Sequence, residues 1–304
     1  MKRYFVIGTA ILLLLPVVFV GGEFLARYAD HKGHYTISMW LFKSFSALGI
    51  DAYNTRIGAM YSRGQGVPRD NVAAAKWYRV AAENGDSVAQ FLIGYAYEDG
   101  KGVSKDYIKA AQWYGKASVQ GIAEAQTFLA ELYVNGRGVP KDYSKAVHWY
   151  REAAEQGLDL AQYALGVMYV NGQGVAQDYA EAIRWFRKAA EQDHPRAQFN
   201  LGAMYTKGWG VAQDYASAVR WFRKAAEQGY ARAMTSLGIR YADGQGVAQH
   251  NIQAHLWLDL AAKRGHAEAA KIRRAVAKRM TATQLGEAQR LAREWLVNFE
   301  ARRM

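Results

Sequence analysis

Tryptophan recurs every 36 residues through the middle of the 304-residue chain, and this spacing constrains the fold more than any other feature. The series consists of Trp77, Trp113, Trp149, Trp185, Trp221 and Trp257. A Gly-x-Gly-Val element, first present at residues 64–67, keeps the same step, and so does a tyrosine that begins at Tyr61. Three series in register, with no insertion or deletion, define six repeated units.

The unit at residues 158–193 shows how each repeat is expected to fold as two helices. In its first half, Ala161, Leu165 and Met168 recur at the spacing of an apolar stripe along a helix. Gly166 lies within that stripe. Because a glycine inside a helix costs about 1 kcal/mol relative to alanine, we expect a second helix to approach closely at this point.

Glycine also ends the first helix, since Gly172 and Gly174 adopt the left-handed C-cap conformation at no steric cost. Asp178 is placed to cap the second helix. Arg187 and Glu191 lie four residues apart on the exposed side of that helix, where an ion pair adds a few tenths of a kcal/mol, and the same pairing recurs in two other units. A lone hairpin cannot cover its apolar faces, so the units are expected to stack into a superhelix.

The repeated unit resembles the Sel1-like repeat, a relative of the tetratricopeptide repeat. Its string is A-Q-x-x-L-G-x-M-Y, then N-G-x-G-V, then D-Y-x-x-A-x-x-W-F/Y-x-x-A-A-E-Q-G. In one unit it is carried by Ala161-Gln162, Leu165-Gly166, Tyr169, Gly172, Gly174, Trp185 and Ala189-Ala190. The resemblance covers six units of 36 residues, or 216 of 304. It implies an all-α, α/α superhelical solenoid that acts as an adaptor or scaffold for protein complexes.

We predict four regions along the chain: residues 1–22, a signal anchor or transmembrane helix; 23–49, a linker and N-terminal capping helix; 50–265, the six repeats; and 266–304, basic C-terminal capping helices. The repeats are placed at residues 50–85, 86–121, 122–157, 158–193, 194–229 and 230–265.

The first region contains nineteen uncharged residues, Tyr4 to Gly22, preceded by Lys2 and Arg3. As a helix it would span roughly 28 Å, close to the hydrocarbon thickness of a bilayer. The two leading cations predict a cytoplasmic N-terminus. We therefore expect a single-pass protein of the inner (cytoplasmic) membrane whose repeats lie in the periplasm or extracytoplasmic space. The alternative is a cleaved signal peptide and a secreted or periplasmic protein.

The two ends of the array need capping units, because a stack of repeats leaves apolar faces at both ends. Residues 34–49 fit the front cap as a degenerate second helix. At the other end, Thr281 and Gln284 resemble a capping box for a final helix. Residues 263–304 carry eleven Lys or Arg against four Asp or Glu, a basic excess that suits a solubilising cap, anionic lipid, an acidic partner or nucleic acid.

The sequence offers little for catalysis. It has no cysteine, which excludes disulfides and thiolate metal sites and makes the chain a poor match to the cysteine-rich branch of the family linked to penicillin binding. Its seven histidines form no metal-binding pattern, and the Gly-x-Gly elements are helix–helix turns and not phosphate-binding loops. We therefore predict that the protein is not an enzyme and has no cofactor or metal.

A partner is expected on the first helices, which by the resemblance line a concave groove. The candidate residues there are Phe91, Tyr95, Glu131, Asn135, Tyr163, Asn171 and Phe199. Aromatic rings beside amide and charged groups suit a bound peptide or amphipathic helix. The alternative for Phe91, Tyr163 and Phe199 is that they belong to the helix–helix core.

Three functions remain open at this point. The leading hypothesis is a membrane-anchored protein–protein interaction scaffold of the bacterial cell envelope. A second is a binder of cell-wall glycan, with Trp209 of the Gly208-Trp209-Gly210 turn as an exposed stacking ring. A third is a penicillin-interacting, β-lactamase-like repeat protein. Nucleic acid is not expected as a partner of an exported chain.

Overall fold

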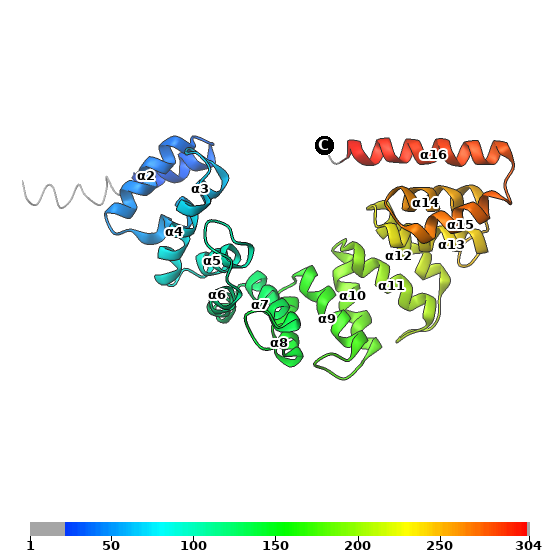
Figure 1. Ribbon diagram of the computed structural model, residues 1–304, viewed down its shortest axis with the longest axis horizontal. Helices are drawn as coiled ribbons and strands as arrows, with labels where there is room; N and C mark the ends of the chain where they lie inside the picture. The colour runs from blue at the N-terminus through cyan, green and yellow to red at the C-terminus, as the bar shows by residue number, and fades with distance from the viewer. Residues whose placement is uncertain (1–21, 303–304) are drawn as a thin grey trace, which may run out of the picture. The chain divides into compact units, whose positions relative to one another are not determined.

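Helices account for all the regular structure that the computed structural model describes, which covers residues 22–302. The expected membrane segment at residues 4–22 therefore lies outside the described residues, except for Gly22. Among the helices that are described, none is long and apolar enough to span a bilayer. The chain divides into two compact units, the first ending at Asp142 and the second beginning at Tyr143 (Figure 1).

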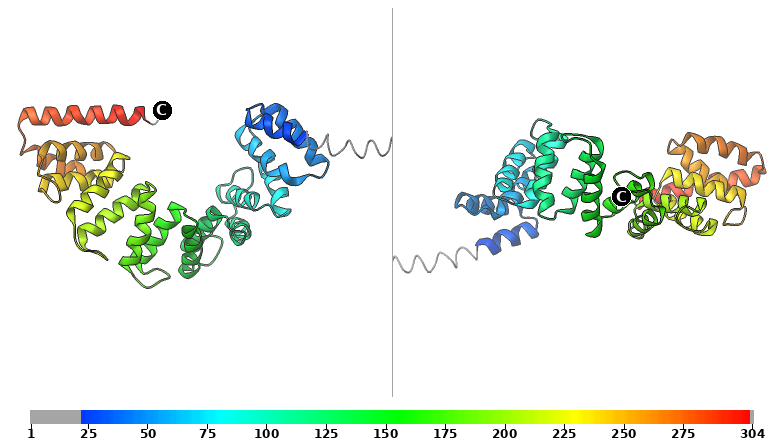
Figure 2. Two further views of the ribbon diagram at one scale, coloured as in Figure 1. Left: turned by 180° about the vertical axis from the view of Figure 1, so that it is seen from behind. Right: turned by 90° about the horizontal axis from the view of Figure 1, so that it is seen from below.

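In the first unit, residues 22–31 are helical and precede α2 (Tyr35–Ala47), η1 (Asp51–Tyr53), α3 (Asn54–Arg63), α4 (Asn71–Glu83), α5 (Ser87–Asp99), α6 (Tyr107–Val119) and α7 (Ala123–Asn135). The second unit contains α8 (Tyr143–Glu155), α9 (Asp159–Asn171), α10 (Tyr179–Glu191), α11 (Pro195–Lys207), α12 (Tyr215–Glu227), α13 (Ala231–Asp243), α14 (Asn251–Lys263), α15 (Ala267–Ala277) and α16 (Ala282–Ala301). From α3 to α14, odd-numbered helices are the first helices of the repeats and even-numbered ones the second. From α2 to α7 and from α8 to α15, each helix packs on the next along the chain, as a helical solenoid requires, whereas α16 packs on α14 (Figure 2).

The two glycines of each turn have different roles. Gly208 ends α11 in the left-handed conformation, with φ of +69°. Gly210 also has a positive φ, and a Cβ placed on it would lie 2.5 Å from the carbonyl carbon of Tyr179, the first residue of α10. The second glycine therefore allows the turn of one repeat to touch the second helix of the repeat before it. The same approach occurs at Gly66, Gly102, Gly138, Gly174 and Gly246.

The glycine inside the first helix has the role that its position predicts. A Cβ on Gly166 would lie 2.7 Å from the ring of Phe186, so α10 approaches α9 closely at this residue. The predicted cap is also confirmed, because the carboxylate of Asp178 accepts hydrogen bonds from the backbone N–H groups of Ala180 and Glu181.

A buried glutamine explains the Ala-Gln pair of the repeat. The Gln162 side chain donates to the carbonyl oxygen of Ala154 at 3.1 Å and accepts from the side chain of Gln192 at 2.9 Å. Gln192 belongs to the end of the following second helix, so this amide joins three consecutive helices. Equivalent bonds are made by Gln90 and Gln198. Each such amide satisfies backbone and side-chain groups that would otherwise be buried without partners.

Four of the periodic tyrosines accept hydrogen bonds from arginines of the preceding repeat: Tyr97, Tyr169, Tyr205 and Tyr241. Arg187 donates to the hydroxyl of Tyr205 at 3.2 Å, and Arg223 donates to that of Tyr241 at 2.6 Å. The predicted pairing of Arg187 with Glu191 is therefore wrong, as are its two counterparts, because the arginine side chain reaches the next repeat and not along its own helix. The spacing of 18 residues recurs between Arg151 and Tyr169, Arg79 and Tyr97, and Lys43 and Tyr61.

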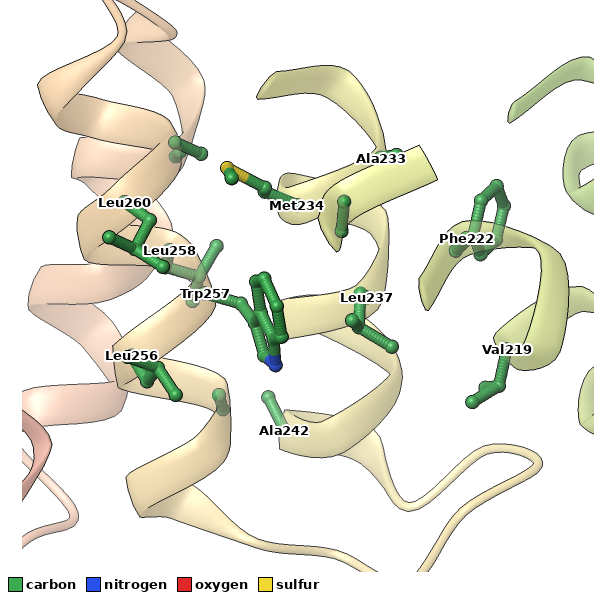
Figure 3. Close-up of a cluster of buried hydrophobic side chains, with 14 of the residues drawn as sticks. Val219, Phe222, Ala233, Met234, Leu237, Ala242, Leu256, Trp257, Leu258 and Leu260 are labelled. Carbon is green, nitrogen blue, oxygen red and sulfur yellow. The ribbon is translucent and has the colours of Figure 1, made fainter. Parts of the chain in front are cut away.

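The caps close the ends of the array. At the front, Phe42 and Phe45 of α2 are buried, whereas Trp40 is 68 % exposed. At the end, the predicted capping box of Thr281 and Gln284 is present and begins α16. This helix packs on α14, where it completes an apolar core built from α12 to α16; Figure 3 shows the part around Leu237 and neighbouring side chains.

Candidate partner-binding surface

Two first helices of the first unit, α5 and α7, bring several of the candidate residues together. Phe91 is half-buried and contacts Tyr114 of its own repeat at a ring distance of 5.8 Å. It also meets Phe128 of the next repeat edge-on at 5.7 Å. Phe91 therefore joins two repeats, as the core alternative predicts, and keeps part of its surface open.

Tyr95 lies one turn further along α5. Its ring meets Phe128 edge-on at 6.0 Å, and its hydroxyl accepts a hydrogen bond of 3.4 Å from the ammonium group of Lys101. The side chain also lines an open cavity of about 210 Å³, together with Arg63 and Arg69. This position gives Tyr95 an aromatic surface that a partner can contact.

Two carboxylates follow these rings on the same helices. The buried Tyr114 hydroxyl donates to Glu98 at 2.7 Å, which orients that carboxylate. Burial raises the pKa of Glu131, and the negative charge of Glu98 raises it further, while Arg137 acts in the opposite direction. The ionised form of Glu131 is therefore destabilised in the free protein, and a cation brought between the two carboxylates would stabilise it.

The two candidate asparagines lie at the ends of their helices. Asn135 is exposed and its side chain donates to the carbonyl oxygen of Glu131 at 2.9 Å. Asn171 is exposed at the equivalent last position of α9. Both therefore lie at the rim of the first-helix surface and not among its rings.

In the second unit, Tyr163 and Phe199 lie at junctions between repeats. Tyr163 stacks on His194 with ring centroids 4.8 Å apart and contacts Phe186 at 5.9 Å. Burial raises the pKa of Tyr163 and lowers that of His194. Phe199 meets Tyr230 edge-on at 5.4 Å. These rings, like Phe91, contribute to stacking and are half-buried.

Sequence reasoning missed the aromatic partners in this unit. His194 and Tyr230 are 36 residues apart and are the N-cap residues of successive first helices. Their regular spacing was a signal in the sequence, because the same position in earlier repeats holds aliphatic Ile122 and Leu158. Aromatic residues at this cap extend the row of rings across the junction.

Trp209, the candidate for stacking on glycan, is 45 % exposed. Its ring stacks on Tyr179 with centroids 5.2 Å apart and an interplanar angle of 17°. One face of the indole is therefore covered by the preceding repeat, and the ring protects the close contact of the neighbouring Gly210. Over residues 22–302, no group of three His, Asp or Glu side chains is arranged to hold a metal ion.

The geometry defines a helical repeat protein in which hairpins of 36 residues stack through rings, buried amides and glycine contacts. The Sel1 repeat model matches the chain six times, at residues 53–86, 87–121, 123–158, 159–194, 195–230 and 231–266. The chain belongs to the Sel1 repeat family, whose solenoids typically serve protein–protein interaction.

Two solved structures are similar to the chain. A Sel1 repeat protein from Oxalobacter formigenes is 33% identical, with a TM-score of 0.70 over 79% of this chain and 96% of that one. The protective antigen c5321 of uropathogenic Escherichia coli, described as having an SLR fold, is 27% identical, with a TM-score of 0.51 over 95% of this chain and 85% of its own. No curated protein matches the sequence.

Proposed function

We propose that the protein is a membrane-anchored, non-enzymatic scaffold of the bacterial cell envelope that binds a partner protein on its first helices. The observation that carries this proposal is the group formed by Tyr95, Glu98, Phe128 and Glu131, which we call the α5–α7 site. It presents half-buried rings beside two interacting carboxylates, on rigid helices.

The chemistry of the α5–α7 site favours a partner segment with a basic side chain. A lysine or arginine would interact with both carboxylates, and the Tyr95 and Phe128 rings would contact its aliphatic stem. The raised pKa of Glu131 supports this choice, because the charge of a cation would offset the effects of burial and of the neighbouring Glu98. An anionic segment would instead add a third negative charge.

Anchoring is supported by the sequence of residues 4–22 and by the cap that follows it. Phe24, Tyr28 and Trp40 are 68 %, 52 % and 68 % exposed. Aromatic side chains of this kind are enriched where proteins meet the headgroup region of a bilayer. We place the repeats on the extracytoplasmic side, because Lys2 and Arg3 precede the apolar segment.

The binding proposal is tested with two variants and one control. Full-length chain in detergent micelles is used to capture proteins from solubilised envelopes, which are then quantified by mass spectrometry. Tyr95→Ala and Glu131→Gln should each lower capture of the same specific proteins at least five-fold. Glu124→Gln, an exposed acid in the first turn of α7, should capture them as wild type does.

Thermal unfolding separates binding from folding. Glu131→Gln should melt at the same temperature as wild type or higher, since it removes a carboxylate that is destabilised in the folded state. If both variants capture the wild-type set of proteins, or if both unfold, the α5–α7 site is not the binding surface. Anchoring is tested separately: the mature protein should keep residues 1–22 by intact mass, and a C-terminal tag should be digested by protease added to spheroplasts.

A further inference from the structure

The last repeat differs from the others on the outward side of its second helix. Leu256, Asp259 and Leu260 of α14 are each at most 6 % exposed. Figure 3 shows Leu256 and Leu260 on the side of α14 that is turned away from Leu237. The equivalent positions of α12 are all exposed, although α13 packs on α12 as α15 packs on α14.

The element that α14 has in addition is α16, although Asp259 itself pairs with Arg273 of α15. It packs on α14, where Trp295 meets Trp257 edge-on at 6.0 Å and Ala292 is fully buried. Phe299 continues the contact to Gly229, just beyond the end of α12. The outward side of a second helix in this chain is thus able to hold a 20-residue amphipathic helix.

In the two preceding repeats the same outward positions carry six exposed cations, which we call the basic stripe: Arg184, Arg187 and Lys188 of α10, and Arg220, Arg223 and Lys224 of α12. They are related to Leu256, Asp259 and Leu260 by steps of 36 residues. The acidic side chains near the stripe are fewer. Glu181 pairs with Arg184 at 2.7 Å, and Glu191 and Glu227 lie at the helix ends.

We infer that the basic stripe binds an acidic amphipathic helix of a partner protein, in the manner in which α16 lies on α14. The packing of α16 on α14 shows how such a helix can lie on a second helix. The positive charge of the basic stripe favours an acidic partner. This surface is formed by second helices and is independent of the α5–α7 site.

The arrangement of the tryptophans favours a protein partner over a lipid surface. The ammonium group of Lys188 lies 4.3 Å from the ring centroid of Trp185, and that of Lys224 lies 4.9 Å from Trp221. These rings are covered by cations and are not presented for insertion into a bilayer. Carboxylates at the spacing of one helical turn can pair with the cations at residues 220 and 224.

The probe is a labelled 20-residue peptide that copies residues 282–301, keeps the apolar positions and has glutamate at every Gln and Arg position. Its binding to the full-length chain in detergent micelles is followed by fluorescence anisotropy. We expect saturable binding that weakens as salt is raised from 50 to 300 mM, because the pairs are exposed. A peptide with lysine at the same positions, and a scrambled acidic peptide, should bind at least ten-fold more weakly.

Charge reversal locates the site. The double variant Arg220→Glu, Lys224→Glu should weaken binding of the acidic peptide at least ten-fold. Lys271→Glu, Lys278→Glu, an equal change at exposed positions on or beside α15, should leave the affinity within two-fold. Circular dichroism checks that both variants keep the helicity of wild type.

Three results would overturn the inference. One is that the protein binds the acidic and the lysine peptides with equal affinity. Another is that the Arg220→Glu, Lys224→Glu variant and the Lys271→Glu, Lys278→Glu control lose affinity for the acidic peptide to the same extent. The third is failure of the acidic peptide to bind while vesicles of phosphatidylglycerol bind wild type better than the stripe variant, which would assign the stripe to a membrane. Since none of these readouts involves Tyr95 or Glu131, failure here leaves the α5–α7 site untouched.

Discussion

The two glycines of the turn between α11 and α12 allow a direct measurement of what the close contact between repeats contributes. Gly208 and Gly210 have almost the same positive φ, +69° and +66°. They differ in their surroundings. A Cβ on Gly208 would lie 3.4 Å from the nearest atom, an ordinary contact, whereas a Cβ on Gly210 would lie 2.5 Å from the backbone of Tyr179.

The expected costs follow from this difference. Alanine in the left-handed conformation costs about 1–2 kcal/mol at either position, partly offset by about 0.4–1 kcal/mol from the less flexible unfolded chain. Gly210→Ala must also displace a backbone carbonyl that is held in α10, and overpacking of this kind costs about 1–3 kcal/mol. We therefore expect Gly210→Ala to be less stable than Gly208→Ala by about 1–3 kcal/mol.

The assay is urea unfolding of the full-length variants in detergent, followed by circular dichroism at 222 nm. Hydrogen exchange by mass spectrometry adds the location, because repeats contact only their neighbours and a local defect is expected to stay local. Gly210→Ala should raise exchange in α10 and α12, and Gly208→Ala should do so much less. If the two variants are equally stable, the reasoning is refuted: the close contact with α10 would not add to the requirement for glycine at residue 210 beyond its positive φ.

Two further predictions concern buried polar groups. Gln198→Leu should lower the free energy of unfolding by about 1–3 kcal/mol in urea titrations, because it leaves the Ala190 carbonyl and the Gln228 amide without their partner; the exposed Gln213→Ala serves as control. Burial lowers the pKa of His255 in the folded protein. As the pH falls, the unfolded chain therefore binds a proton at His255 before the folded protein does. Stability should therefore decline below about pH 6.5 and level off once the folded-state pKa is passed, with a smaller slope in His255→Leu.

The repeat architecture was predictable because its signals are periodic. Gly166, Asp178 and the capping box at Thr281 each have a local chemical reason that can be read from one stretch of sequence, and each is confirmed. The predicted Arg187–Glu191 pair is wrong for the complementary reason. Its true acceptor, Tyr205, lies 18 residues away in another repeat, and rules for a single helix contain no such neighbour.

The candidate surface was only partly accessible to sequence reasoning. Spacing placed Phe91, Tyr163 and Phe199 on the first helices. It could not show that each ring is only half-buried, with one part in contact with the second helix of its own repeat and another part open to a partner. Those contacts are with Tyr114, Phe186 and Phe222, respectively. The raised pKa of Glu131 depends on its burial and on the nearby charge of Glu98, and these arise only when the chain is folded. Likewise the sequence predicted a final helix beginning at the Thr281 capping box without indicating that this helix covers α14.

The contacts that join repeats within each unit connect residues at constant separations, such as 18 for the arginine–tyrosine pairs and 30 for the paired glutamines. Removing or duplicating residues 158–193 or 194–229 therefore reconnects these donors to equivalent acceptors. Unequal recombination between repeats can lengthen or shorten such a gene without creating a misfolded junction. Evolution can thus adjust the reach of this protein in whole repeats while keeping the same terminal caps.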